Sequence, residues 1–245
     1  MIEGFQRLSK IMASRGMCSR READRYIERG LVTVNGVIID QLGSKVSLDA
    51  EIELNTIAVK EQGRLSTFII NKPIGYVSSQ PEDNHKPAVS LLNTQNRWTG
   101  DRVRNSFTTY QLKGIAPAGR LDIDSCGLLI LTQDGRIAKQ LIGEHSAIDK
   151  EYLVRVKGSL TDKDLKLLNY GLSLDGKKLK PAKVIWQNRD QLRFVLQEGK
   201  KRQIRRMCEL VNLNVVGLKR IRIGKIILGK LPEGKWRYLS NHEKF

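Results

Sequence analysis

The sequence of 245 residues has few cysteines and histidines. Cys18, Cys126 and Cys208 are scattered along the chain without C-x-x-C spacing, and the three histidines lie in polar stretches without the spacing of metal ligands. We therefore expect neither a disulfide framework nor a metal site. Free thiols of this kind are typical of the cytoplasm.

Long apolar runs are also absent. No uninterrupted apolar stretch approaches the roughly 18–20 residues that a membrane-spanning helix needs. The first ten residues, MIEGFQRLSK, lack the apolar core of a secretory signal. We expect a cytoplasmic protein that makes no contact with a membrane.

Positive charge is abundant and unevenly placed. The chain has 43 Lys and Arg against 26 Asp and Glu, a net charge of +17. Residues 1–62 hold nine basic and nine acidic residues, whereas residues 200–230 hold ten basic residues against Glu209 alone. This concentration favours nucleic acid as the partner, because each neutralised phosphate releases condensed counterions. An acidic protein or a membrane surface is the alternative.

The N-terminal segment is predicted to form two short helices and a hairpin. The first helix runs over residues 7–14, and Ser19-Arg20-Arg21-Glu22 has the pattern of a capping box that starts the second. Gly30 is a plausible end for that helix. Asn35-Gly36, between two apolar runs, is the strongest short-range signal for a hairpin.

The polar residues 55–64 are interpreted as a connector between an N-terminal domain, 1–60, and a second domain, 65–245. Strands that pair mostly with their neighbours, together with a few packed helices, predict an α+β fold with a mixed, mostly antiparallel sheet. The expected strands cover residues 65–71, 76–79, 127–132, 151–156, two segments within 183–198, 215–223, 226–228 and 236–239. The expected helices end at residues 141, 169 and 211, and residues 80–117 are expected to be loop.

The stretch 118–135, AGRLDIDSCGLLILTQDG, is a polar, glycine-lined loop that runs into a buried strand. A carboxylate placed there is held by a rigid element at the edge of a core, as a catalytic group requires. Asp122 and Asp124 are the candidates. Two carboxylates near a loop more often cap a helix or bind water, so the residues alone leave both interpretations open.

This stretch resembles the signature of the RsuA/RluB/RluF family of ribosomal RNA pseudouridine synthases, in which GRLD, D(S/T), G, an apolar strand and TxDG follow one another. Further segments resemble the family in the same order: NKP at 71–73, KEY at 150–152 and the basic segment 198–207. Residues 7–36 resemble the RNA-binding domain named after the fourth small-subunit ribosomal protein. Met207-Cys208-Glu209 favours an RluF-like member.

The resemblance implies a role for several residues. Asp122 is the carboxylate that breaks the C1′–N1 bond of uridine, and Arg205 pairs with it, since a buried carboxylate needs a cation to stay ionised. Tyr152 stacks on the target base and Leu218 forms an apolar floor. Asp124 is expected to be structural, and no metal, nucleotide or redox cofactor is implied. Without the resemblance, Tyr152 would be interpreted as plain core.

The expected RNA contacts are basic residues of the N-terminal helices, the signature loop and the C-terminal cluster. They are Arg7, Lys10, Arg20, Arg21, Arg25, Arg120, Lys200, Lys201, Arg202, Arg206, Lys219, Arg220 and Arg222. For Arg202 and Arg206 a solvated helix face is the alternative. The expected partner is ribosomal RNA (23S rRNA or a pre-ribosomal particle), bound by a monomer. The alternative function is a non-catalytic RNA-binding or ribosome-assembly protein on the same scaffold.

The connection between residues 92 and 118 is longer than the family pattern leads us to expect. It interleaves arginines with aromatic residues: Arg97, Trp98, Arg102, Arg104, Phe107 and Tyr110. Such a mixture suits phosphates and stacked bases. It equally suits an ordered decoration that packs its aromatic side chains on the domain, and the sequence leaves both readings open.

Overall fold

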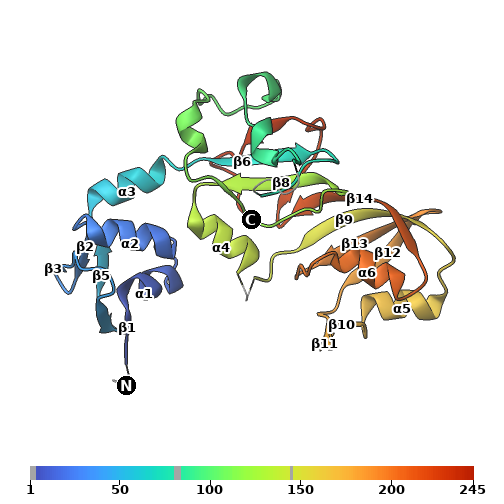
Figure 1. Cartoon of the computed structure of the whole chain (residues 1–245), viewed down its shortest axis with the longest axis horizontal. Helices are drawn as coiled ribbons and strands as arrows, with labels where there is room; N and C mark the ends of the chain where they lie inside the picture. The colour runs from blue at the N-terminus through green and yellow to red at the C-terminus, as the bar shows by residue number, and fades with distance from the viewer. Residues whose placement is uncertain (1–3, 80–83, 144–145) are drawn as a thin grey trace.

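The computed structural model describes residues 4–79, 84–143 and 146–245, and its first part is a small domain of helices and short strands (Figure 1). Its elements are β1 (Phe5–Arg7), α1 (Leu8–Ser14), α2 (Arg20–Glu28), β2 (Val32–Val34), β3 (Val37–Ile38), β4 (Lys45–Ser47) and β5 (Ile52–Leu54). Both predicted helices and the predicted hairpin are confirmed. Ser19 and Glu22 form the capping box, and Asn35 and Gly36 take the positive φ angles of 49° and 80° that a tight hairpin requires.

The segment expected to be a polar connector is a helix, α3 (Thr56–Gly63). The Asn55 side chain accepts a hydrogen bond from the Ile57 N–H at 2.9 Å and so caps the helix start. Only Ala58 and Gln62 of this helix are buried. The prediction missed it because so narrow a buried stripe leaves almost no apolar periodicity in the sequence.

The second part is built on a nine-stranded sheet with the order β12-β13-β9-β14-β8-β6-β16, to which β7 and β15 add at β8 and β14. The strands are β6 (Thr67–Lys72), β7 (Ala116–Pro117), β8 (Cys126–Thr132), β9 (Lys150–Lys157), β12 (Lys183–Asn188), β13 (Gln191–Leu196), β14 (Asn214–Ile223), β15 (Ile226–Ile227) and β16 (Trp236–Tyr238). All neighbours are antiparallel except β8 and β14, which are parallel. The expected mixed, mostly antiparallel sheet is confirmed.

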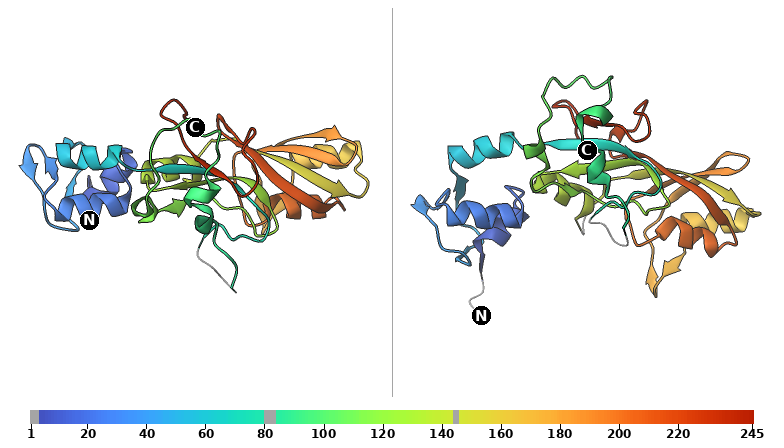
Figure 2. Two further views of the ribbon diagram at one scale, coloured as in Figure 1. Left: turned by 90° about the horizontal axis from the view of Figure 1, so that it is seen from above. Right: turned by 45° about the horizontal axis from the view of Figure 1, so that its top comes forward.

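Helices cover both faces of this sheet. Along β6, Phe68 and Ile70 belong to one hydrophobic core and Ile69 to another, because successive side chains of a strand point to opposite faces. The helices α5 (Asp162–Asn169) and α6 (Gln203–Glu209) pack on the first core, and α4 (Gly135–Ile142) packs on the second. Figure 2 shows α5 and α6 together under the far end of the sheet, away from the N-terminal domain.

Three features differ from the predicted strands and loops. Residues 76–79 form no strand; Val77 makes one isolated bridge, to Pro87. The expected loop 80–117, of which residues 80–83 lie outside the described part, contains short 3-10 helices and β7. These helices are η1 (Ala88–Leu91), η2 (Thr94–Asn96) and η3 (Thr109–Leu112). A further hairpin, β10 (Ser173–Leu174) with β11 (Lys177–Lys178), was not predicted.

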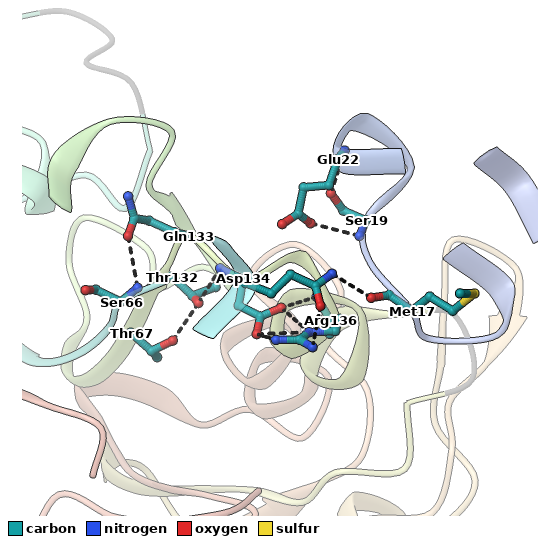
Figure 3. Close-up of polar contacts among 10 residues, drawn as sticks. Met17, Ser19, Glu22, Ser66, Thr67, Thr132, Gln133, Asp134 and Arg136 are labelled. Atoms are coloured by element: carbon teal, nitrogen blue, oxygen red, sulfur yellow. Dashed lines mark hydrogen bonds and ion pairs between the residues drawn. The ribbon is translucent and has the colours of Figure 1, made fainter. Parts of the chain in front are cut away.

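The N-terminal domain touches the start of α4, as Figure 3 shows. Arg136 pairs with Asp134 at 2.7 Å and donates to the Gln62 side chain at 3.1 Å, and Gln62 donates to the Met17 carbonyl at 2.8 Å. A Cβ atom on Gly135 would lie 2.1 Å from the Cβ of Ser19. The absence of a side chain at Gly135 therefore allows the start of α4 to lie against the start of α2.

A second glycine allows the parallel strands to approach. Gly127 has a φ of +104°, and a Cβ atom there would lie 2.2 Å from the Arg220 carbonyl oxygen. Any other residue would combine a strained backbone with a collision against a backbone atom that cannot move aside. The pairing of β8 with β14 thus depends on this position.

We predict that Gly127→Ala lowers the free energy of unfolding by about 3 kcal/mol or more, through strain and overpacking together. Gly63→Ala is the matched control, because no atom lies within 4 Å of its added methyl group and its φ is not positive. In that helix alanine should be neutral or stabilise by up to about 1 kcal/mol. Urea unfolding followed by circular dichroism measures both, and an unchanged midpoint for Gly127→Ala would contradict the prediction.

Candidate active site

A cleft of about 640 Å³ opens at the end of the sheet where β8 begins. It is lined by the loop before β8, the start of β9, the segment leading into α6, and β14. All four residues expected at the site line it: Asp122, Tyr152, Arg205 and Leu218. They come from positions up to 96 residues apart (218 minus 122), so the sheet order is what brings them together.

The backbone that carries Asp122 is held on both sides. The buried Ser78 hydroxyl donates to the Leu121 carbonyl at 2.7 Å and accepts from the Leu121 N–H at 2.8 Å. The Gly75 N–H donates to the Ile123 carbonyl at 2.8 Å. Sequence reasoning gave Ser78 no role, because its partner is 43 residues away. These bonds fix the loop before any ligand binds.

The Asp122 side chain is half-buried and lines the cleft. Within the described residues it makes no hydrogen bond or ion pair of its own. A carboxylate in this state can take a ligand without first breaking a contact inside the protein.

Arg205 does not pair with Asp122, so the expected pairing is wrong. Its guanidinium lies 3.2 Å from the Asp124 carboxylate and donates to the carbonyls of Asp124 and Val215 at 3.0 and 3.1 Å. Arg202 reaches the same carboxylate at 3.1 Å. The residue expected to be structural is therefore the anionic partner of two arginines, which tie α6 to the signature loop.

These arginines change the acidity of Asp124. Its partial burial acts to raise the pKa, but the hydrogen bond from Arg202 and the charge of Arg205 outweigh that effect and hold the pKa below its usual value. Asp124 thus stays ionised at neutral pH beside the cleft.

Lys72 lies under the same loop and is fully buried. Its ammonium donates to the carbonyls of Pro73 and Tyr76, both at 2.8 Å. Burial lowers the pKa of Lys72 to about 8, although Cys126 and the carboxylates of Asp124 and Asp122 act to raise it. The sequence marks this lysine only as part of the NKP segment, with no sign that it lies beneath the two aspartates.

Arg220, expected to contact RNA, is only 2% exposed and lines the cleft from within the sheet, not the outer surface. It donates to the carbonyls of Leu128 and Arg120 at 2.7 and 3.2 Å, and its guanidinium lies 6.0 Å from the centre of the Tyr152 ring. Buried beside Tyr152, it supports the cleft from within. Arg222 is also occupied, since it pairs with Glu151 at 2.6 Å.

The other predicted RNA contacts lie nearer the surface. Arg120, Lys200, Lys201 and Arg202 line the cleft. Arg206 pairs with the exposed Asp175 at 2.6 Å, and Lys219 is half-buried on β14. On the N-terminal domain the expected residues are all exposed: Arg7, Lys10, Arg20, Arg21 and Arg25. Two basic side chains that were not among the expected RNA contacts, Lys150 and Lys180, also line the cleft.

Comparison with known proteins decides the family. A family model described as RNA pseudouridylate synthase matches residues 66–210, and an S4 domain model matches residues 6–52. The chain belongs to the RNA pseudouridine synthase family. Its expected membership is confirmed, and so is the expected RNA-binding domain at the N-terminus.

Named relatives match nearly the whole chain. Ribosomal large subunit pseudouridine synthase B of Bacillus subtilis is 34% identical over 245 residues, covering 98% of this chain and 94% of the relative. Dual-specificity RNA pseudouridine synthase RluF of Escherichia coli K12 is 34% identical over 242 residues, covering 97% and 76%. Because both kinds match equally well, the preference for an RluF-like member stays a prediction.

A solved structure has a similar fold. The crystal structure of a pseudouridylate synthase superposes with a TM-score of 0.64 at 26% identity, covering 96% of each chain. The similarity therefore extends over both the S4 domain and the sheet.

We predict that Asp124→Asn destabilises the protein by about 1 kcal/mol at pH 7, a modest value because the carboxylate is 40% exposed and screened by water. The pKa of Asp124 is lowered in the folded state, so its stabilisation is complete above the unfolded pKa, near 4, and is lost as pH falls through the folded value. Urea unfolding measures the free energy of unfolding of wild type and variant. The difference between the two should be constant from about pH 5 to about pH 8 and should shrink at lower pH. Asp175→Asn, which leaves Arg206 unpaired on the surface, should show no comparable change, and equal effects would contradict the assigned role of Asp124.

Proposed function

We propose that this chain isomerises a specific uridine in structured ribosomal RNA, in 23S rRNA or a pre-ribosomal particle, with Asp122 as the catalytic carboxylate. The observation that carries the proposal is the cleft itself, in which Asp122, Tyr152 and Leu218 meet beneath a basic rim. The names of the relatives, which refer to the ribosomal large subunit and to dual-specificity RNA modification, support a ribosomal target.

The reaction rearranges one nucleotide. The C1′–N1 bond of uridine breaks, the ring turns, and a new bond forms between C1′ and C5. The proton on C5 is lost to solvent and N1 gains one, so atoms and electrons balance without an oxidant, a reductant or a second substrate. The group that the step requires is a carboxylate able to act as nucleophile or base at the sugar or the ring.

Asp122 suits that role because its backbone is fixed and its side chain has no partner among the described residues. Tyr152, on β9 next to the buried Arg220, offers a ring on which the target base can stack. Leu218 adds apolar surface. Arg205 acts through Asp124: the ion pair ties α6 to the loop and so helps to fix the position of the reacting carboxylate.

Binding is expected to be spread more widely than the chemistry. Arg120 and Lys201 at the rim and the exposed arginines of the S4 domain present positive charge to the phosphates on either side of the target. We further propose that the protein acts as a monomer in the cytoplasm. Light scattering of the purified protein, alone and with RNA, tests whether it is a monomer.

We predict that Asp122→Asn lowers kcat by at least about 10³-fold while RNA affinity stays within a few-fold, since one carboxylate carries the chemistry and many cations carry binding. The measurement is tritium release from ribosomal RNA labelled at uridine C5, combined with filter binding. Asp190→Asn, which removes an exposed carboxylate on the turn between β12 and β13, is the control and should leave turnover unchanged.

Retained turnover in purified Asp122→Asn would rule out the catalytic assignment. Mapping of pseudouridine in ribosomal RNA from cells with and without the gene identifies the target. If no site disappears, the chain binds RNA without modifying it.

A further inference from the structure

A second cleft, of about 850 Å³, lies at the opposite end of β6 from the first. Three segments and Gln111 form it; the segments are residues 63–67, 102–105 and 238–242. Its lining includes Arg64, Arg102, Arg104 and His242, and no Asp or Glu. A hollow lined by three arginines and no carboxylate is built for an anion.

The long connection after residue 92 supplies two of these arginines and is firmly braced. Arg97 pairs with Asp101 at 3.0 Å and donates to the carbonyls of Asn105, at 2.6 Å, and Val103. Its guanidinium also lies 5.0 Å from the centre of the Tyr238 ring. The Arg97 side chain is therefore occupied by contacts within the protein.

The aromatic residues of the connection settle the alternatives that its sequence left open. Phe107 packs against Phe68 and Trp236, with ring centres 6.1 and 5.0 Å apart, and Trp98 packs partly buried against the core under α4. Only Tyr110 remains available, at 76% exposed, and it lies outside the cleft lining. The connection is thus an ordered segment whose aromatic side chains pack on the domain, as one of the two interpretations proposed. It also presents arginines at the second cleft.

The side chains of Arg64, Arg102 and Arg104 are exposed and form no hydrogen bond or ion pair with any residue that the structure describes. Each retains a planar guanidinium that matches a phosphate with two parallel hydrogen bonds. Because the backbone between Arg102 and Arg104 is held from below by Arg97, little loop entropy remains to be lost on binding.

We propose that this second cleft binds the RNA backbone outside the target stem-loop. The inference rests on the proposed function and deepens it by naming a second contact on the same substrate. Lys72 pairs with Gly127, which in turn pairs with Arg220 of the first cleft, and Thr67 at the other end of β6 lines the second cleft. Five residues of strand therefore separate the two, about 17 Å at about 3.4 Å per residue. A phosphate bound there belongs to flanking RNA, beyond the nucleotide in the first cleft.

The test compares two double variants, each of which removes two positive charges from a different part of the protein. The variant Arg102→Gln with Arg104→Gln is compared with Lys163→Gln plus Lys166→Gln, two exposed lysines of α5 at the other end of the sheet. Both pairs of substitutions leave the same net charge. The probes are in vitro transcribed 23S rRNA and a short stem-loop that carries the target uridine, and thermal unfolding verifies that both variants fold.

We expect the arginine variant to bind the long RNA about tenfold more weakly at physiological salt. Its slope of log affinity against log salt should fall by about 1.8, the value for two phosphate contacts. Affinity for the short stem-loop, and tritium release at saturating RNA, should match the wild type. The lysine variant should change none of these.

Equal losses in the two variants would show a general charge effect and overturn the proposal. Unchanged affinity of the arginine variant for the long RNA would overturn it as well. If the wild type releases no tritium while the arginine variant still binds long RNA more weakly, the isomerase function fails and this second contact stands.

Discussion

The parallel pairing of β8 with β14 brings the loop that carries Asp122 against the basic helix α6. Only the positions Cys126–Lys219 and Gly127–Arg220 pair directly, and Gly127 is what allows the backbones so close. The Arg220 side chain extends the contact, because it donates hydrogen bonds to the carbonyls of Leu128 in β8 and Arg120 in the preceding loop. The cleft, its apolar floor and its basic rim all lie around this one seam.

Charge inside the protein is organised around the seam as well. Lys72, Arg205 and Arg220 are all buried there, and each donates to backbone carbonyls, so each cation is stabilised partly by peptide dipoles. The carboxylate of Asp124 balances one of them directly. This arrangement leaves the Asp122 side chain without an ion pair among the residues that the structure describes. Its carboxylate therefore remains accessible to a ligand in the cleft.

The sequence was sufficient for features set by local rules. The capping box at Ser19, the hairpin at Asn35-Gly36 and the apolar strand 127–132 all follow from short patterns, and the motif matches placed Asp122, Tyr152, Arg205 and Leu218 in one cleft. Features set by distant contacts were out of reach. The partner of Arg205 depends on how α6 docks on the sheet. The two hydrogen bonds between the Ser78 hydroxyl and the Leu121 backbone join residues 43 positions apart. The burial of Arg220, which a count of basic residues treats as surface charge, follows only from the central place of β14 in the sheet.

That central strand is made well after the N-terminal domain. The S4 domain, with its exposed arginines, ends near residue 54, whereas the seam needs residues 214–223. During synthesis at about 5–20 residues per second, domains fold in order from the N-terminus. The RNA-binding domain is therefore synthesised roughly 8 to 34 seconds before the last residue of β14 (169 residues, 223 minus 54, at that rate). Each newly made chain therefore passes through a stage in which its S4 domain can fold but its cleft cannot yet form.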